Sequence, residues 1–269
     1  MKTFVINLER DSEKRLSMVK QLVATKLDFE IVPAIDGKLM PEVELNAAYD
    51  QERALKFIHR RLTAGEVGCA LSHLKVLRHI VSTAIPMALV LEDDALITTG
   101  ALDVLKTLEH LQLAEEPRVF ILTHVLKYSA WKRKPATQDG KYSLYPVFDA
   151  YCAHGYVVTN TAAKRLLVYF ENLHHPIDYW NVLRRKRVVK ISGVVPYCIG
   201  NTALASGSEI DKERREISAH LHLTWAAHIR NMMRRYLWEK FLYQLAKPFL
   251  RIRRQEKVKL ERVISSDLL

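Results

Sequence analysis

The sequence predicts an α/β fold built on a mainly parallel sheet, and two observations carry this prediction. The first third of the 269-residue chain alternates β-rich runs with segments of helical periodicity. Residues 87–91 (MALVL) form a continuous apolar run that is too short for a helix and is followed by three acids. Such a run is typical of a central strand covered on both faces. Strands separated by helices favour a parallel sheet with helices packed on it.

The first elements follow in order along the chain. Residues 3–8 (TFVINL) predict a strand, and residues 11–24 carry apolar side chains at helical spacing. Residues 29–32 (FEIV) predict a second strand, which ends at Pro33 and the turn at Asp36-Gly37.

A long helix is predicted over residues 64–82. Thr63 is placed to cap its first turn, and Glu66, three residues on, completes the pattern of a capping box. The elements expected after the central strand are strands at 118–123, 156–158, 188–191 and 194–197 and a helix over 160–169 that Asn160 or Thr161 opens.

The amino-acid composition of the chain changes at about Asp211. Residues 212–262 hold 14 Lys or Arg against 5 Glu, which places +9 of the chain's net charge of +11 in this segment. Aromatic and aliphatic residues recur there every three to four positions, which is typical of an amphipathic basic helix. We therefore expect a catalytic domain over residues 1–211 and a basic helical appendage over residues 212–269.

Composition bounds the class of protein. Hydrophobic residues make up 49% of the chain and charged residues 26%, as in ordinary globular proteins. The high net charge suits nucleic acid, an anionic membrane surface or a phosphorylated substrate. Three cysteines without CxxC spacing predict neither a disulfide framework nor a structural zinc site. With no signal peptide or membrane-spanning run, we expect a cytoplasmic protein that rests on the inner face of the inner membrane.

Three acids directly after the central strand are the sharpest chemical feature. Ligands of open α/β sheets bind beyond the carboxyl ends of the strands, which is where Glu92, Asp93 and Asp94 fall. The pleat places Glu92 and Asp94 on one side and Asp93 on the other. Adjacent carboxylates favour a hard divalent cation, Mn²⁺ or Mg²⁺, which would in turn hold a diphosphate. The alternative is that Asp93 and Asp94 only cap or turn the chain.

Three segments, in this order, carry a resemblance to a known family: INLERDSEKR near the start, GEVGCALSH at 65–73 and LVLEDD at 89–94. Together they resemble glycosyltransferase family 25, which covers bacterial lipooligosaccharide galactosyl- and glucosyltransferases and the collagen galactosyltransferases. The resemblance continues more weakly to about residue 216. It implies a Rossmann-like nucleotide-diphospho-sugar transferase fold of the A type, and UDP-galactose or UDP-glucose as the donor.

The resemblance also implies where the nucleotide binds. The residues carried over to the nucleotide seat after the first strand are Asn7, Leu8, Arg10 and Arg15. The alternative is a plain surface turn with solvated arginines. In the helix motif, Cys69, Ser72 and His73 match the family. His73 is either a substrate contact or a buried, hydrogen-bonded histidine, and Cys69 is expected to pack rather than to act as a nucleophile.

Asp178 is the second acid expected to act in catalysis. Family members carry a similar acid after an apolar turn, and an inverting transfer needs one carboxylate to accept the proton of the attacking hydroxyl. The neighbouring aromatic residues Tyr179 and Trp180 suggest a surface for stacking sugar rings. The alternative role of Asp178 is a helix N-cap.

Two further segments resemble the family less specifically. His154 and Gly155 would lie close to the donor sugar, although Gly155 could equally mark a bulge. Related transferases often supply a third metal ligand, commonly His, from a late segment, which here contains no His. Asn201 is the nearest candidate by position, and Ser208 is a candidate phosphate contact.

The expected function is the transfer of galactose or glucose from a UDP-sugar to a hydroxyl of a lipid-linked lipooligosaccharide or lipopolysaccharide acceptor, with inversion implied by the resemblance. The basic clusters at 184–187 and 132–134, together with the basic tail, suit an anionic membrane surface. The alternatives for these segments are that the clusters are plain solvated surface and that the helices of the tail pack on the domain's own core. The alternatives are a basic nucleic-acid-binding protein and a metal-dependent phosphodiesterase. The chain has no helix-turn-helix, zinc-finger, RRM or KH signature, so we expect no nucleic-acid partner.

Overall fold

The computed structural model describes residues 1–111, 113, 115–202, 248–257 and 260. Its strands are β1 (Lys2–Asn7), β2 (Phe29–Pro33), β3 (Met87–Glu92), β4 (Ala95–Ile97), β5 (Arg118–Ile121), β6 (Lys127–Ser129), β7 (Lys134–Pro135), β8 (Ser143–Asp149), β9 (Gly155–Thr159), β10 (Lys190–Val195), β11 (Ile199–Asn201) and β12 (Ile252–Arg254). Its helices are α1 (Ser12–Thr25), η1 (Gly37–Leu39), α2 (Glu42–Ala47), α3 (Gln51–Ile58), α4 (Ala64–Ser82), α5 (Thr99–His110), α6 (Asn160–Tyr169), η2 (Phe170–Asn172) and α7 (Trp180–Arg185).

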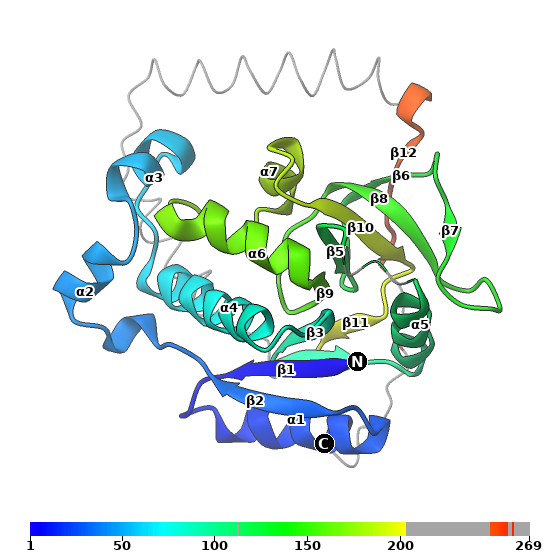
Figure 1. Cartoon of the computed structure of the whole chain (residues 1–269), viewed down its shortest axis with the longest axis horizontal. Helices are drawn as coiled ribbons and strands as arrows, with labels where there is room; N and C mark the ends of the chain where they lie inside the picture. Colours follow the sequence, from blue (N-terminus) through cyan, green and yellow to red (C-terminus); the bar gives the residue numbers. More distant parts are fainter. Residues whose placement is uncertain (112, 114, 203–247, 258–259, 261–269) are drawn as a thin grey trace.

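Ten of the described strands form one sheet in the order β12-β6-β8-β10-β5-β9-β3-β1-β2, with β7 paired to β8 (Figure 1). Most of them run in the direction of β1, as the sequence predicts. The strands β8, β9 and β12 run in the opposite direction. Because β9 is antiparallel to both β3 and β5, its first residue, Gly155, pairs with Leu91 near the end of β3. The residues before β9 therefore arrive at the edge where β3 ends.

Both faces of the central strands are buried. Phe4 of β1 and Val90 of β3 belong to a core shared with α4 and α6, whereas Val5 and Leu89 belong to a core shared with α1 and α5. Figure 1 shows α1 on one side of β1 and β2 and α4 on the other. This alternation explains why residues 87–91 are continuously apolar and confirms the interpretation of that run as a doubly covered strand.

The long helix predicted over residues 64–82 is α4. The hydroxyl of Thr63 accepts a hydrogen bond from the amide of Glu66 at 3.0 Å, and the Glu66 carboxylate accepts one from the Thr63 amide at 3.0 Å. The predicted capping box is therefore confirmed. Glu66 also receives two hydrogen bonds of 2.6 Å from the Arg60 guanidinium, so it anchors the helix start and does not face the acids after β3.

Two details of the predicted elements differ from the structure. Neither Asn160 nor Thr161 caps α6, because the Thr159 hydroxyl accepts from the Ala162 amide at 3.2 Å and serves as the N-cap. The two late strands predicted within residues 188–197 are the single strand β10. Residues 188 and 189, which the sequence predicts as strand, instead belong to the connection from α7 to β10. In this connection the amide of Val188 donates to the carbonyl of Leu183.

The basic helical segment predicted over residues 212–269 is not confirmed. Most of it, and the predicted boundary after residue 211, lie outside the described residues. Residues 252–254 form β12, which pairs antiparallel with β6. Ile252 is buried there, and the Gln255 side chain accepts from the Val125 amide at 2.7 Å and donates to the Val194 carbonyl at 3.2 Å. Burial and these hydrogen bonds favour the strand over a helical turn. None of the described helices is long and apolar enough to cross a membrane.

A close approach between α4 and the chain after β2 requires glycine. A Cβ atom on Gly68 would lie 2.5 Å from the backbone nitrogen of Gly37 and 2.5 Å from the carbonyl oxygen of Ile35. We expect Gly68→Ala to lower the free energy of unfolding by about 1–3 kcal/mol, because the backbone must shift to admit the methyl group. Urea denaturation measures this. Arg78→Ala, at an exposed position of the same helix, should stay within about 0.5 kcal/mol of the wild type, and equal stability of all three proteins would contradict the packing argument.

Candidate functional site

The three acids lie where β3 ends and the chain turns into β4. Glu92 is the last residue of β3, and Asp93 and Asp94 form the turn. Asn7 ends the neighbouring parallel strand β1, so the carboxyl ends of two parallel strands meet at this point. This is the edge at which ligands of open α/β sheets bind.

Asp93 is held by the segment that follows β1. The Asn7 side-chain amide donates to Oδ2 of Asp93 at 2.7 Å and to the carbonyl of Asp11 at 3.1 Å. The Lys14 ammonium lies 3.7 Å from Oδ1 of Asp93 and 3.5 Å from Asp11. Although burial by itself lowers the pKa of Lys14, the charges of Asp93, Asp11 and Asp94 raise its pKa overall. Lys14 therefore stays charged beside the acids.

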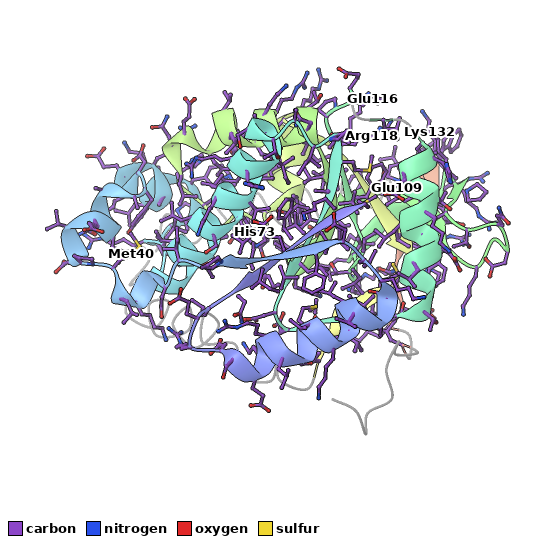
Figure 2. The ribbon with its side chains drawn as sticks, turned by 60° about the horizontal axis from the view of Figure 1, so that its bottom comes forward. Met40, His73, Glu109, Glu116, Arg118 and Lys132 are labelled. Carbon is purple, nitrogen blue, oxygen red and sulfur yellow. The ribbon has the colours of Figure 1, made fainter. Side chains whose placement is uncertain are left out.

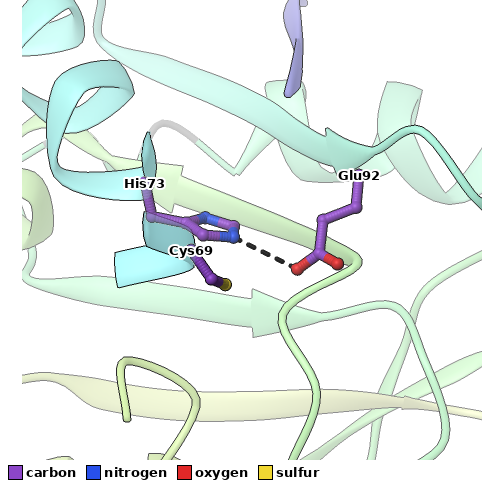
Figure 3. Close-up of side chains that lie close together, drawn as sticks. All are labelled: Cys69, His73 and Glu92. Atoms are coloured by element: carbon purple, nitrogen blue, oxygen red, sulfur yellow. Dashed lines mark hydrogen bonds and ion pairs between the residues drawn. The ribbon is translucent and has the colours of Figure 1, made fainter. Parts of the chain in front are cut away.

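Glu92 turns the other way, towards α4. Nε2 of His73 donates to Oε1 of Glu92 at 3.2 Å (Figure 3). The Tyr156 hydroxyl donates to Nδ1 of His73 at 3.0 Å. His73 is fully buried and lies well inside the outline of the molecule in Figure 2, whereas Met40 lies towards its left side. Both ring nitrogens of His73 have protein partners. His73 is therefore a buried, hydrogen-bonded histidine that positions Glu92.

The electrostatic environments of the acids differ. Burial raises the pKa of Glu92, but the hydrogen bond from His73 and the nearby histidines His73 and His154 lower it overall. Burial raises the pKa of Asp93, which Lys14 and Asn7 counter only in part. Burial and the charges of Glu92 and Asp93 raise the pKa of Asp94 to about 7.

Asp94 is the acid of the trio whose carboxylate has no close ion-pair partner among the described residues. Its Oδ1 atom is buried and has no hydrogen-bond partner among the described residues. A divalent cation bound by Asp94 and Asp93 would satisfy that oxygen and cancel the repulsion, and carboxylate oxygens are the donors that Mn²⁺ and Mg²⁺ prefer. The carboxylate donors of Asp94 and its neighbour Asp93 therefore suit such an ion in kind.

A second group of potential ligands shares Glu92. The sulfur of Cys69, a ring nitrogen of His73 and a carboxylate oxygen of Glu92 all lie within 4.8 Å of one another (Figure 3). Thiolate and imidazole are donors for a softer ion than Mn²⁺, such as Zn²⁺. The His73–Glu92 hydrogen bond accounts for this arrangement without an ion.

The arginines of the predicted nucleotide seat have partners outside the acid trio. Arg10 forms an ion pair with Asp36, and Arg15 donates to the Glu9 carbonyl at 2.7 Å. Leu8 is half-buried, and its carbonyl accepts from the Asp11 amide at 2.9 Å. Among the four residues predicted there, the structure joins Asn7 to the acid trio.

Asp178 is connected to the site by a hydrogen bond from the segment before β9. Its Oδ2 atom accepts a hydrogen bond from the Cys152 amide at 3.1 Å. The N-cap of α7 is Tyr179 and no side chain caps the helix, so the alternative role of Asp178 as N-cap is wrong. Trp180 is only 1% exposed, and its indole donates to the Cys152 carbonyl. The proposed sugar-stacking surface therefore cannot include Trp180.

Gly155 and Asn201 lie on either side of the acid turn. Gly155 pairs regularly with Leu91, without a bulge, and a Cβ atom there would lie 2.7 Å from Cγ2 of Ile199. Glycine is thus required by packing against β11. Asn201, at the end of β11, pairs with Ala95 directly after the trio. The candidate phosphate contact Ser208 lies outside the described residues.

The sequence of this chain is also similar to that of a known protein family. Residues 1–180 match the family described as "Glycosyltransferase family 25 (LPS biosynthesis protein)". The chain belongs to glycosyltransferase family 25. The match includes the Asn7 loop, the His73 helix, the acid trio and Asp178.

Curated relatives of this glycosyltransferase family 25 chain come from animals. A glycosyltransferase 25 family member of Anopheles gambiae is 28% identical over 214 residues, covering 72% of this chain and 35% of that protein. Procollagen galactosyltransferase 1 of Danio rerio is 30% identical over 177 residues, 61% of this chain and 28% of that protein. A family member of Drosophila pseudoobscura pseudoobscura is 39% identical over 99 residues, 34% of this chain and 15% of that protein. The chain thus spans about a third or less of these relatives.

Lys14 and Tyr156 are the site residues that sequence reasoning on this family 25 chain missed. Lys14 lies near the start of the helix that follows β1. A lysine at that position faces the end of the strand, so its place at the site could have been predicted from the sequence. Tyr156 lies within an apolar strand and becomes a partner of His73 only through the antiparallel insertion of β9.

The repulsion among the acids predicts a pH-dependent stability. The pKa of Asp94 in the folded protein, about 7, exceeds that of an exposed Asp, about 3.9. The folded state therefore retains a proton that the unfolded chain loses, and the contribution of Asp94 to stability falls as pH rises from about 4 to 7. Asp94→Asn cannot ionise, so it should raise the free energy of unfolding by about 1–3 kcal/mol at pH 8 and change it little at pH 4.

Urea denaturation at both pH values, without added metal, tests this. Asp103→Asn, whose side chain is 66% exposed on α5, should leave stability within about 0.5 kcal/mol of the wild type at either pH. A lower stability of Asp94→Asn at pH 8 would show that the Asp94 carboxylate holds the turn together.

Proposed function

We propose that this protein transfers galactose or glucose from a UDP-sugar to a hydroxyl of a lipooligosaccharide or lipopolysaccharide glycan. The observation that supports this most is the mutually repelling acid trio at the end of β3, in which Asp93 is buried and Glu92 and Asp94 are half-buried, next to Asn7 at the end of β1. Family membership supports a transferase, and the animal relatives include procollagen galactosyltransferases. The hexose, the acceptor and metal dependence are parts of the proposal.

Asp93 and Asp94 would hold a Mn²⁺ or Mg²⁺ ion, with Glu92 as a neighbouring carboxylate. When bound, the ion supplies positive charge to the diphosphate of the donor and to the departing UDP. The protein's own part is to hold the carboxylates in place. Asn7 and Lys14 fix Asp93, and the buried His73 fixes Glu92.

Asp178 is the proposed base. The acceptor hydroxyl oxygen attacks the anomeric carbon, the bond from that carbon to the UDP oxygen breaks, and Asp178 takes the hydroxyl proton while UDP leaves with the bonding electrons. A single displacement of this kind inverts the configuration at the anomeric carbon. The Cys152 amide orients the Asp178 carboxylate. Because the same segment continues to His154, whose carbonyl accepts from the Glu92 amide at 3.2 Å, the base and the acids are joined by a short stretch of backbone.

The basic surface supports an acceptor carried on an anionic membrane. Arg185 and Arg187 are exposed next to α7, and residues 132–134 are exposed at the β6–β7 turn. Such clusters gain about 1 kcal/mol per residue near an anionic lipid surface. We propose that the protein acts from the cytoplasmic side as a peripheral protein, with the basic segment 212–269 contributing to binding.

A metal-dependent phosphodiesterase is the second candidate, because the acid trio would hold the same ion for phosphate hydrolysis. The two functions differ in their products. A transferase releases UDP and moves the hexose to the acceptor, whereas a phosphodiesterase cleaves between the phosphates of the UDP-sugar and releases UMP.

Metal-dependent UDP release is the first test. With Mn²⁺, UDP-galactose or UDP-glucose and delipidated lipooligosaccharide, the wild type should release UDP and form a hexosylated product. Asp94→Ala should lose at least about a hundredfold in rate, because the ion and the charge it supplies are lost. Asp103→Ala should match the wild type. Full turnover by Asp94→Ala, or UMP as the product, would exclude the proposed function.

Asp178→Asn separates the base from the metal site. Removing a general base typically slows the chemical step by about 10²- to 10⁴-fold, so kcat for transfer should fall in that range. Because the donor is held elsewhere, the affinity for UDP, measured by calorimetry with Mn²⁺, should stay within about twofold of the wild type. Unchanged kcat would show that Asp178 only holds the loop before β9.

A further inference from the structure

Polar and aromatic side chains gather where the end of β8 meets α7, beside the proposed base. We call Asp149, Tyr151, Asn181 and Arg184 the β8–α7 cluster. The amide nitrogen of Asn181 donates to Oδ1 of Asp149 at 3.1 Å and to the Tyr151 hydroxyl at 3.3 Å. Figure 1 shows α7 above β8, and the two elements are in contact.

Two polar atoms of this cluster have no hydrogen-bond partner among the described residues. They are Oδ1 of Asn181, an acceptor, and Nε of Arg184, a donor. The two residues are three positions apart on α7 and therefore lie on one face of the helix. A buried polar atom without a partner typically costs about 1–3 kcal/mol, and such atoms are uncommon in native proteins. The pair is suited to a ligand group that both donates and accepts, as a hydroxyl does.

Aromatic surface lies next to these polar atoms. Tyr151 is 38% exposed, and its ring meets that of Tyr179 edge-on with 5.8 Å between the centroids. The Arg184 guanidinium lies 4.7 Å from the centroid of the Phe148 ring, which limits its movement. An exposed aromatic face beside a carboxylate, an amide and a guanidinium offers both contacts that a sugar ring needs, one for its C–H face and one for its hydroxyls.

The cluster is close to the reacting groups. Tyr151 directly precedes Cys152, whose amide binds Asp178, and Tyr179 directly follows Asp178. Three residues separate Tyr151 from Gly155, which pairs with Leu91 near the end of β3. The Cα of Tyr151 therefore lies within roughly 15 Å of the Cα of Gly155.

We propose that the β8–α7 cluster is the acceptor subsite, which binds a hexose ring of the acceptor glycan, and this inference rests on the proposed function. Tyr151 stacks on the C–H face of the ring. Asn181, Asp149 and Arg184 bind adjacent hydroxyls once the exposed Tyr151 side chain rotates from the amide of Asn181. The subsite thereby presents the next hydroxyl of the glycan to Asp178.

Saturation-transfer difference NMR with the full chain tests the subsite directly. The probe is the core oligosaccharide released from lipooligosaccharide by mild acid, titrated into the wild type and into Tyr151→Ala, Asn181→Ala and Tyr151→Phe. Tyr151→Ala and Asn181→Ala should each weaken binding about tenfold, or about 1.4 kcal/mol. Tyr151→Phe keeps the ring and should bind within about threefold of the wild type. Trp131→Ala, which removes an exposed aromatic side chain elsewhere, should bind as the wild type does.

The outcomes separate this inference from the proposed function. UDP release from the UDP-sugar is measured on the wild type in parallel. If the wild type releases UDP but binds no oligosaccharide, or if Tyr151→Ala and Asn181→Ala bind as tightly as Trp131→Ala, the acceptor subsite is wrong while the transferase stands. If the oligosaccharide binds through Tyr151 but no UDP is released under any condition, the sugar site stands and the proposed function fails.

Discussion

The repulsion among three carboxylates at the end of β3 is the constraint on which the rest of the site depends. The protein supplies hydrogen-bond or ion-pair partners to two of them. Asp93 receives the Asn7 amide and the Lys14 ammonium, and Glu92 receives the His73 ring. Asp94 receives no comparable partner, and burial beside the other two acids raises its pKa to about 7. Such a carboxylate is costly for folding alone and is explained if a cation completes the site, since proteins retain local strain where function needs it.

The topology of the sheet brings the other groups to this charge. Because β9 is inserted antiparallel between β3 and β5, the chain enters β9 at the edge where β3 ends. The segment before β9 therefore carries Cys152, and with it Asp178, towards Glu92. The short pairing of β4 with β11 places Asn201 on the other side of the acid turn. The residues proposed to bind the donor, to act as the base and to bind the acceptor are thus arranged around one strand end.

Local signals in the sequence were sufficient for much of this fold. The Thr63–Glu66 capping pattern gave the start of α4, and the apolar run before Glu92 gave a doubly buried strand. The direction of β9 was not predictable in this way, because strand direction depends on long-range pairing. The same reason applies to Trp180: its aromatic character suggested a sugar platform, but its burial against the Cys152 carbonyl is decided by tertiary packing. Asn7 was expected at the site, whereas its neighbour Arg10 is drawn away by Asp36.

Binding of Mn²⁺ to the intact chain tests the central claim most directly. Electron paramagnetic resonance reports free Mn²⁺, so a titration at pH 8 gives the bound fraction with and without UDP. The account predicts one bound ion per chain, at least about tenfold tighter in the presence of UDP because the diphosphate completes its coordination, and loss of this ion in Asp94→Ala. A free-ion signal that the protein does not reduce, either alone or beyond the effect of UDP itself, would contradict the account, because the carboxylates would then hold only the turn.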